Sequence, residues 1–415
     1  MAEKEKDKLV LGPYRVLDLT DDSGALCPRI LASLGADVIK IEPPAGDPTR
    51  NIGPFYHDEA EPEKSLHWFT YNLNKRSITL NLETATGQEL FRKLVKTADI
   101  LVESFRPGYL NKLGIGYAKL HKINPRLVHT SITPFGSRGP YAGFESSALV
   151  CLAMSGFLNT IGDPDRPPVQ VASPVAYTQG GMEAAAATMI AFWYQQQTGK
   201  GQHVDVSIRD SIMAQFVNPG FVWKIRGVMP SRGIGGPQVP GMAPNRAVAK
   251  CKDGYVLCHV THVTSRQPLR QWLADAGMAG DLMDPKWDQP FMKGGKFPEA
   301  LKAHVDELFA AFAATRTKEE LMHEAQKRGA QVAREQTVAD VVNDPHVKAR
   351  EYFVQVEHPE LNDTITYGGA SFKLDGMPKQ WRRAPFIGEH NQEIYGEELG
   401  LNQNELTILK ESGVI

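Results

Sequence analysis

Cysteine and histidine residues in the second half of the sequence have the side chains of a metal site. Cys251, Cys258, His259 and His262 lie close together along the chain. Zinc hooks pair two cysteines at a shorter spacing than that of Cys251 and Cys258. Residues 254–260 have the character of a strand, in which Cys258 would be a small buried side chain. The sequence therefore favours a structural role for these residues, and we expect no bound metal.

The motifs of independent catalytic sites are missing from the sequence. It has no phosphate-binding P-loop, no nucleophile elbow and no H-E-x-x-H zinc motif. Gly114-Ile115-Gly116 lacks the third glycine of the dinucleotide-binding fingerprint and does not directly follow a strand. We therefore expect a site that binds something other than NAD, or that binds it differently.

Strands and helices that alternate along the first half of the chain would have to position such a site. Short apolar or alternating runs predict strands, and apolar stripes at helical spacing predict helices. The predicted strands are residues 15–19, 36–42, 77–82, 100–102, 127–132 and 203–207, and the predicted helices are 27–34, a segment from Thr84, and 174–197. Alternation of this kind forms βαβ units, so the sequence predicts an α/β fold with a largely parallel sheet.

Changes in composition suggest how the chain divides into domains. Residues 1–11 are expected to form a flexible tail, and residues 12–226 the first part of a large domain. Gly and Pro crowd residues 227–241, which predicts a linker into a small domain that extends to residue 330. Residues 331–415 would return to the large domain, with a helix over 338–348 broken at Pro345 and strands over 353–374.

Composition excludes several classes of protein. The chain has 415 residues, with 46 Lys and Arg against 48 Asp and Glu, so its formal net charge is −2. This balance argues against a nucleic-acid partner, which usually requires a basic surface. The apolar stretch over 148–161 is too short to span a membrane. Four scattered cysteines are typical of a reducing compartment, so we expect a cytoplasmic protein.

Six phrases along the chain resemble the family III CoA-transferases, the group that includes formyl-CoA transferase and carnitine CoA-transferase. The phrases occur in the family's order and cover the chain from about Gly12 to about Leu401. They are Leu34-Gly35-Ala36-Asp37-Val38-Ile39-Lys40-Ile41-Glu42-Pro43-Pro44, Asn74-Lys75-Arg76-Ser77-Ile78, Val102-Glu103-Ser104-Phe105-Arg106-Pro107-Gly108, Thr198-Gly199-Lys200-Gly201-Gln202, Asn343-Asp344-Pro345-His346 and Arg383-Ala384-Pro385-Phe386-Ile387-Gly388-Glu389-His390.

The resemblance implies a Rossmann-like large domain built from both ends of the chain, with a small α/β domain inserted between them. It also implies that two subunits thread through each other as an interlocked dimer. The implied reaction moves CoA from an acyl-CoA to a free carboxylic acid through a catalytic Asp, whose carboxylate accepts CoA and later returns it. That chemistry needs no cofactor, because the CoA thioester is itself a substrate.

The sequence departs from the family at the residue that carries this chemistry. The family's nucleophilic Asp lies in a phrase that here reads Pro174-Val175-Ala176-Tyr177. A phenol with a reference pKa of about 10 is mostly protonated at neutral pH and cannot form an acyl anhydride. A second acidic position of the family corresponds to Ala148. We therefore expect no catalytic residue in this chain, and we interpret Tyr177 as a side chain that fills space.

The positions that would contact CoA are only partly retained. Phe105 matches an aromatic residue on the adenine side of the family's site, and Lys112 matches a basic position nearby. Lys75 and Arg76 are also retained, although ion pairs or surface solvation would explain them equally well. Asp21 and Asp22, next to each other after the first strand, would repel a diphosphate. Residues 233–236 match part of a mobile loop of the family, and a plain linker explains them as well.

Three hypotheses follow. In the first, the chain is a non-catalytic subunit whose homologous, Asp-bearing partner performs the transfer, with succinyl-CoA as the candidate donor and benzylsuccinate as the candidate acceptor. In the second, the chain forms an active homodimer that uses a displaced carboxylate. The carboxylates nearby in the sequence are Glu145, Asp163, Asp165 and Glu183. In the third, the chain binds acyl-CoA without catalysing a reaction. The first hypothesis explains both departures, and we rank it above the others.

Overall fold

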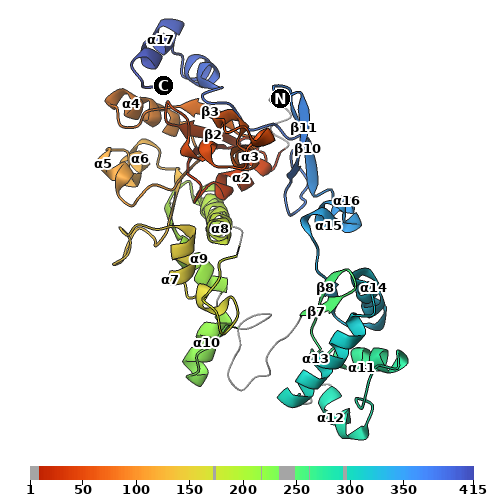
Figure 1. Cartoon of the computed structure of the whole chain (residues 1–415). Helices are drawn as coiled ribbons and strands as arrows, with labels where there is room; N and C mark the ends of the chain where they lie inside the picture. Colours follow the sequence, from red (N-terminus) through yellow and green to blue (C-terminus); the bar gives the residue numbers. More distant parts are fainter. Residues whose placement is uncertain (1–8, 172–173, 216, 233–247, 261, 293–296) are drawn as a thin grey trace. The chain divides into compact units, whose positions relative to one another are not determined.

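The computed structural model describes residues 9–415 except for 172–173, 216, 233–247, 261 and 293–296 (Figure 1). Most of the expected tail and the Gly-rich residues 233–236 therefore lie outside the described residues. The chain forms two compact units. Unit 1 contains Met1–Ser155, Val171–Gln215 and Pro345–Ile415, and unit 2 contains Gly156–Gln170 and Phe216–Asp344.

A parallel six-stranded sheet organises unit 1. Its strands lie in the order β3-β2-β1-β4-β5-β6, which is the order of the Rossmann fold. The bounds are β1 Arg15–Leu19, β2 Asp37–Glu42, β3 Arg76–Thr79, β4 Ile100–Glu103, β5 Val128–Thr133 and β6 His203–Ser207. Every one of these strands pairs in parallel with its neighbours. The predicted α/β fold with a Rossmann-like large domain is thus confirmed.

Two helices of unit 1, α4 and α7, begin at a capping side chain. Thr84 accepts a hydrogen bond from the backbone N–H of Gly87 at the start of α4, and Ser147 accepts one from Val150 at the start of α7. The helices between the strands are α2 Leu26–Ser33, α3 Leu66–Asn72, α4 Ala85–Val95, α5 Tyr109–Lys112, α6 Tyr117–Ile123, α7 Ala148–Met154, α8 Val175–Thr198 and α9 Ile208–Gln215.

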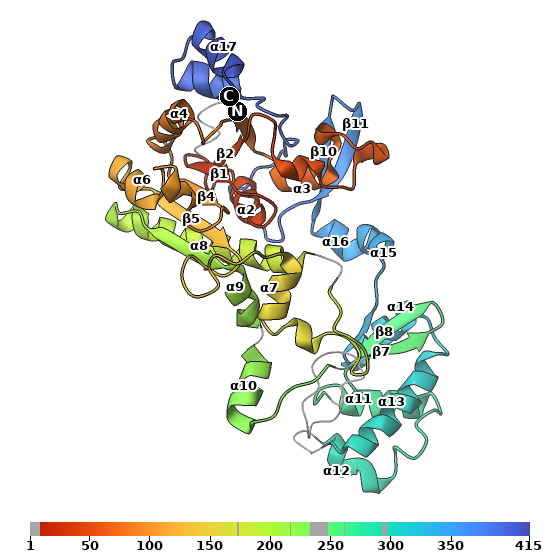
Figure 2. The same ribbon diagram turned by 60° about the vertical axis from the view of Figure 1, so that its left-hand side comes forward.

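The long helix α8 packs on β5 and β6 and contacts α2 and α9 (Figure 2). It ends at Gly199, which has the left-handed φ of 73° that glycine adopts without strain. A Cβ at Gly201 would lie 2.1 Å from the carbonyl oxygen of Leu127, so the return into β6 requires a glycine there. The two glycines of the phrase Thr198–Gln202 therefore have separate structural reasons.

The C-terminal part of unit 1 covers the exposed edge of the sheet. His390 donates its backbone N–H to the carbonyl of Ser77, and Asn391 Oδ1 accepts the backbone N–H of Thr79, so both residues pair with the edge strand β3. The hairpin of β10 Phe353–His358 and β11 Asp363–Gly368 packs against Trp68 and Phe69 of α3. The remaining elements are α16 Pro345–Ala349, a π-helical segment Gln392–Glu398 and α17 Gln403–Glu411.

Unit 2 is a smaller α/β unit around an antiparallel sheet in the order β7-β8-β9. Its elements are α10 Val217–Arg226, β7 Val248–Cys251, β8 Gly254–Cys258, α11 Arg266–Asp275, α12 Asp288–Phe291, α13 Glu299–Ala313, α14 Lys318–Arg328, β9 Val332–Arg334 and α15 Val338–Asn343. Cys251 and Cys258 are buried in its apolar core. Among the described residues, no group of three or more His, Cys, Asp or Glu side chains could hold a metal ion.

The units differ from the sequence-based division at three places. Residues 331–344 were assigned to the returning part of the large domain, but Val332 pairs with Cys258, so β9 belongs to the sheet of unit 2. Residues 156–170 and 216–226, assigned to the large domain, also group with unit 2. None of the described helices is long and apolar enough to cross a membrane.

Candidate functional site

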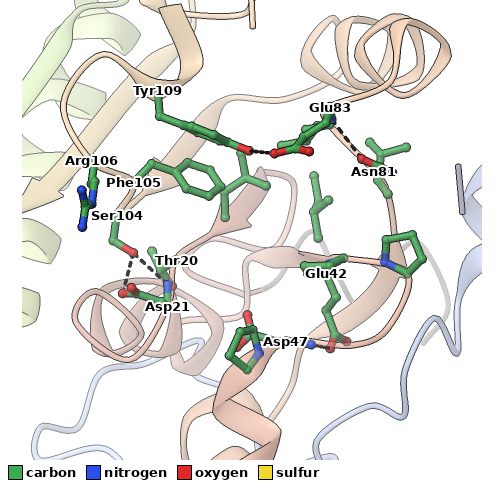
Figure 3. Close-up of a pocket in the computed structure, with 17 residues that line it drawn as sticks. Thr20, Asp21, Glu42, Asp47, Asn81, Glu83, Ser104, Phe105, Arg106 and Tyr109 are labelled. Atoms are coloured by element: carbon green, nitrogen blue, oxygen red, sulfur yellow. Dashed lines mark hydrogen bonds between the residues drawn. The ribbon is translucent and has the colours of Figure 1, made fainter. Parts of the chain in front are cut away.

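A pocket of about 560 Å³ opens at the carboxyl ends of the first strands of unit 1 (Figure 3). Strand β1 lies between β2 and β4, the point at which the order of the parallel strands reverses, and ligands of such sheets bind in the crevice outside that point. The lining residues are Leu19, Thr20, Asp21, Ile41, Glu42, Pro43, Pro44, Asp47, Pro48, Leu80, Asn81, Leu82, Glu83, Ser104, Phe105, Arg106 and Tyr109. The fold therefore places a binding crevice where a Rossmann-like sheet should have one.

The loop after β1 is fixed by hydrogen bonds to the loop after β4. The backbone N–H of Asp21 donates to Ser104 Oγ at 2.7 Å, and that hydroxyl donates back to Asp21 Oδ1 at 2.8 Å (Figure 3). The same Oδ1 accepts the backbone N–H and the hydroxyl of Ser23 at 2.9 and 2.6 Å. The Asp21 carboxylate is thus held in the wall of the pocket.

Two of the four carboxylates in the lining are neutralised by buried cations. Glu42 accepts two hydrogen bonds from the Arg50 guanidinium, at 2.7 and 2.8 Å. Asp47 lies 2.8 Å from Lys40 Nζ. Among the described residues, no cationic side chain lies within ion-pair distance of Asp21 or Glu83.

Arg106 is the cation of the lining, and it forms an ion pair with Glu145, which is not part of the lining. The pocket is therefore negative where a diphosphate would require positive charge.

An aromatic wall closes one side of the pocket. Phe105 and Tyr109 have ring centroids 4.7 Å apart, and the Tyr109 hydroxyl donates to Glu83 Oε1 at 3.3 Å (Figure 3). Phe105 thus lies in the pocket, and its ring offers a flat apolar surface. Lys112, at the end of α5, does not line it. Glu83 and Tyr109 were not singled out from the sequence, because Glu83 lies in a loop and Tyr109 begins a four-residue helix, and neither carries a periodic signal.

Lys75 and Arg76 are held in ion pairs inside unit 1. Lys75 Nζ lies 2.7 Å from Asp18 Oδ2 and donates to Asn72 Oδ1 at 3.0 Å, and both members of the ion pair are completely buried. Arg76 contacts Asp37 at 2.5 Å and Glu398 at 2.7 Å. Neither cation lines the crevice. Burial alone would raise the pKa of Asp18, but the charges of Lys75 and Lys40 outweigh burial and hold it below its usual range.

Tyr177 lies in the first turn of α8 and is half-buried. Burial raises the pKa of its hydroxyl, and the neighbouring Cys151, Asp22 and Asp21 raise it further. A hydrogen bond from the backbone N–H of Ala148 opposes this rise. The structure thus brings together positions 177 and 148, the two at which the sequence differs from the family pattern. The protonated phenol of Tyr177 lies close to Asp21 and Asp22.

The structure describes all four carboxylates that the second hypothesis named. Glu145 is largely exposed and pairs with Arg106, and Glu183 is exposed on α8. Asp163 and Asp165 belong to unit 2, where Asp165 is exposed and Asp163 is partly exposed and lies 3.8 Å from Arg166. Neither Glu145 nor Glu183 lines the crevice of unit 1.

Comparison with known proteins agrees with the fold. The chain matches the model of CoA-transferase family III over residues 11–391. It is 35% identical to the succinyl-CoA:(R)-benzylsuccinate CoA-transferase subunit BbsE of Thauera aromatica, over 92% of this chain and 93% of the relative. It is 33% identical to the formyl-CoA:oxalate CoA-transferase of Streptomyces avermitilis, over 97% of this chain and 98% of the relative.

A solved structure of a CAIB/BAIF family protein from Brucella suis is also similar. Its TM-score is 0.79 at 30% sequence identity, with 92% of this chain and 98% of that chain covered. The chain therefore belongs to CoA-transferase family III, as the six phrases of its sequence predicted.

Because Lys75 is buried in an ion pair, its replacement should lower the free energy of unfolding. Lys75→Met leaves the Asp18 carboxylate buried without its nearest cation, which should cost about 3–5 kcal/mol of unfolding free energy at neutral pH. Because the folded pKa of Asp18 is depressed, the stabilisation is present above its unfolded pKa of about 3.9 and is lost as the pH falls through the folded pKa. Urea unfolding across pH 3–7 measures both effects.

Lys93→Met on the exposed face of α4 is the matched control and should change stability by no more than about 0.5 kcal/mol. Equal stability losses in the two variants would contradict the assignment of Lys75 to a buried ion pair.

Proposed function

We propose that this chain is a non-catalytic subunit of a heteromeric CoA-transferase, in which a homologous, Asp-bearing subunit performs the covalent chemistry. The observation that supports this proposal best is the protonated Tyr177 at the position of the family's nucleophile. The pocket charges and the ion pairs of Lys75 and Arg76 support it independently.

The reaction itself explains why a tyrosine cannot replace the carboxylate. A carboxylate attacks the thioester carbonyl and forms a mixed anhydride as the CoA thiolate leaves. The thiolate then attacks the carbonyl that belongs to the enzyme, which releases the donor acid and leaves CoA on the enzyme as a thioester. A phenolate would form an aryl ester and has no carbonyl of its own to hold CoA. The second step therefore has no electrophile on Tyr177.

The charge of the crevice supports a separation of roles between the subunits. Asp21 and Glu83 face the pocket without cationic partners among the described residues, so the diphosphate of CoA would be repelled there. We infer that CoA occupies the sister subunit. The substrates are then an acyl-CoA, with succinyl-CoA as the donor, and a free carboxylic acid of the benzylsuccinate type. The support for both is the 35% identity to a relative whose name gives succinyl-CoA and (R)-benzylsuccinate and describes it as a subunit.

Assembly and environment complete the proposal. The two homologous chains would form an interlocked pair with a large, mostly apolar interface. The transfer needs no cofactor, because the carboxylate of the sister chain carries CoA. All four cysteines are free thiols and buried, which is compatible with a reducing cytoplasm.

Co-expression with an Asp-bearing homologue from the same genome tests the assembly. We expect the two chains to copurify in equal amounts and to transfer CoA together, because each would supply half of the interlocked interface. Purification through a tag on this chain, followed by mass determination and an activity assay, measures this. A stable homodimer of this chain alone that is fully active would refute the proposal.

The role of Tyr177 is tested by removing its hydroxyl and keeping the ring. Tyr177→Phe in the heteromer should leave turnover per Asp-bearing site close to that of the parent and cost at most about 0.5–1.5 kcal/mol of stability. Tyr194→Phe on the same helix is the matched control, and Asp→Asn in the sister chain should abolish transfer.

Steady-state CoA transfer by each reconstituted heteromer is the measurement. A loss of roughly a hundredfold or more in Tyr177→Phe, with intact assembly, would show that the tyrosine acts as a nucleophile or general acid.

A further inference from the structure

A second pocket of unit 1 lies at the opposite ends of the strands from the crevice. Its volume is about 450 Å³, within the range of small-ligand sites. Asp37 and Arg76, the first residues of β2 and β3, line it, so it opens at the amino ends of these strands. Much of the rest of its lining is apolar, and Asn74, Arg382 and His390 supply polar groups. No residue of this pocket lines the crevice.

Asn74 carries a buried donor that has no acceptor among the residues that the structure describes. The residue is 6% exposed and has a left-handed φ of 66°. Its Oδ1 accepts the backbone N–H of Arg382 at 2.7 Å, which fixes the orientation of the amide. Its Nδ2 is buried and has no hydrogen-bond partner among the described residues. A buried donor without an acceptor costs about 1–3 kcal/mol, so a ligand that supplies the acceptor would recover this free energy.

Arg382 adds a guanidinium group to the same pocket. It donates to the backbone oxygen of Asn74 at 3.0 Å, so the two side chains are held side by side. In the part of the chain that the structure describes, no carboxylate lies within ion-pair distance of Arg382. The planar guanidinium can therefore offer parallel N–H groups to an anion.

His390 provides a third donor. Its Nδ1 accepts the backbone N–H of Ser77 at 3.2 Å, and burial lowers its pKa below the ordinary value. The neutral ring therefore carries its proton on Nε2, which is free to donate. The amide, the guanidinium and the imidazole all belong to residues that line one cavity.

The two carboxylates in the lining are already occupied. Asp37 accepts the guanidinium groups of both Arg15 and Arg76, at 3.0 and 2.5 Å. Glu393 lies 2.9 Å from Arg76, which also contacts Glu398. Among the described residues, Arg382 is the guanidinium of the lining that has no carboxylate within ion-pair distance, and Asp37, Glu393 and Glu389 attract its charge from farther away.

We propose that this pocket binds a small organic carboxylate, held by the Arg382 guanidinium and the Asn74 amide, with the His390 imidazole as a further donor and the apolar lining around its hydrocarbon part. A planar carboxylate matches the fork of an arginine whose guanidinium contacts no carboxylate of the described residues. A phosphate ester carries more charge than one arginine balances. The inference does not depend on the proposed function, because it concerns another pocket.

Calorimetric titration of the purified assembly with propionate tests the site, with inorganic phosphate as the comparison anion. The decisive variant is Asn74→Asp, which keeps the oxygen that accepts the Arg382 N–H, tolerates the left-handed backbone and replaces the free donor by a negative charge. We expect propionate to bind the parent saturably and at least about tenfold more weakly to Asn74→Asp.

Asn362→Asp is the matched control. Asn362 also has a left-handed backbone, with a φ of 51°, but it is exposed in the β10–β11 turn and does not line the pocket. Propionate should bind this variant as it binds the parent, even if the CoA-transfer site also takes carboxylates. Arg382→Lys keeps the positive charge but loses the planar, two-pronged guanidinium group. It should bind propionate more weakly than the parent and more tightly than Asn74→Asp.

Three results would overturn the proposal. They are the absence of saturable propionate binding to the parent, equal binding by Asn74→Asp and Asn362→Asp, and tighter binding of phosphate than of propionate. Each readout is binding rather than transfer activity, so failure here is distinguishable from failure of the proposed function.

Discussion

A buried charge network that joins β1, β2 and Lys75, the residue before β3, holds the first half of unit 1 together. Asp18 at the end of β1 contacts Lys75 at 2.7 Å and accepts the backbone N–H and the hydroxyl of Thr20 at 2.9 and 2.7 Å. Lys40 of β2 donates to the carbonyl of Thr20 and pairs with Asp47 at 2.8 Å. Buried charges are tolerated only when they are paired in this way, so the network fixes the loops that form the crevice.

This internal pairing decides the chemistry of the crevice. Lys40, Arg50, Lys75 and Arg76 all carry positive charge close to the first strands, and each is used in an internal ion pair. The loop that the network fixes carries Asp21 into the pocket wall instead. The crevice, which lies where a Rossmann-like sheet binds nucleotides, thus has two lining carboxylates without a contacting cation among the described residues, and the pKa of Tyr177, at the position that the sequence aligns with the family's nucleophile, is raised. The two changes agree with the proposed role, in which this subunit would hold no CoA and would need no carboxylate to accept it.

Local patterns in the sequence were enough to predict the central sheet. Strands β1 and β6 have the predicted bounds, since short apolar runs between turn residues leave little freedom, and the helix break at Pro345 separates α15 from α16. Strand β9 was missed because three residues show no periodicity, and it moves the boundary of unit 2. The family could be identified because its phrases are spread along the whole chain.

Side-chain partners could not be predicted in the same way. Lys75 could bind a ligand or form an internal ion pair, and the outcome depends on Asp18. Asp18 is distant in the sequence and lies close to Lys75 only in the folded sheet. The Asn74–Arg382 contact joins the two ends of the chain and is likewise invisible to local patterns. The proximity of Ala148 to Tyr177 also depends on how α7 and α8 pack.

The number of CoA molecules bound by the assembled heteromer tests the central claim most directly. Titration of CoA into the purified complex, with each chain quantified separately, counts the sites without requiring knowledge of the acceptor acid. If the crevice of this chain rejects CoA, saturation occurs at one CoA for each Asp-bearing chain, and none is bound by this chain. Two CoA molecules for each pair of chains would show that Asp21 and Glu83 do not exclude the diphosphate, and the separation of roles would be wrong.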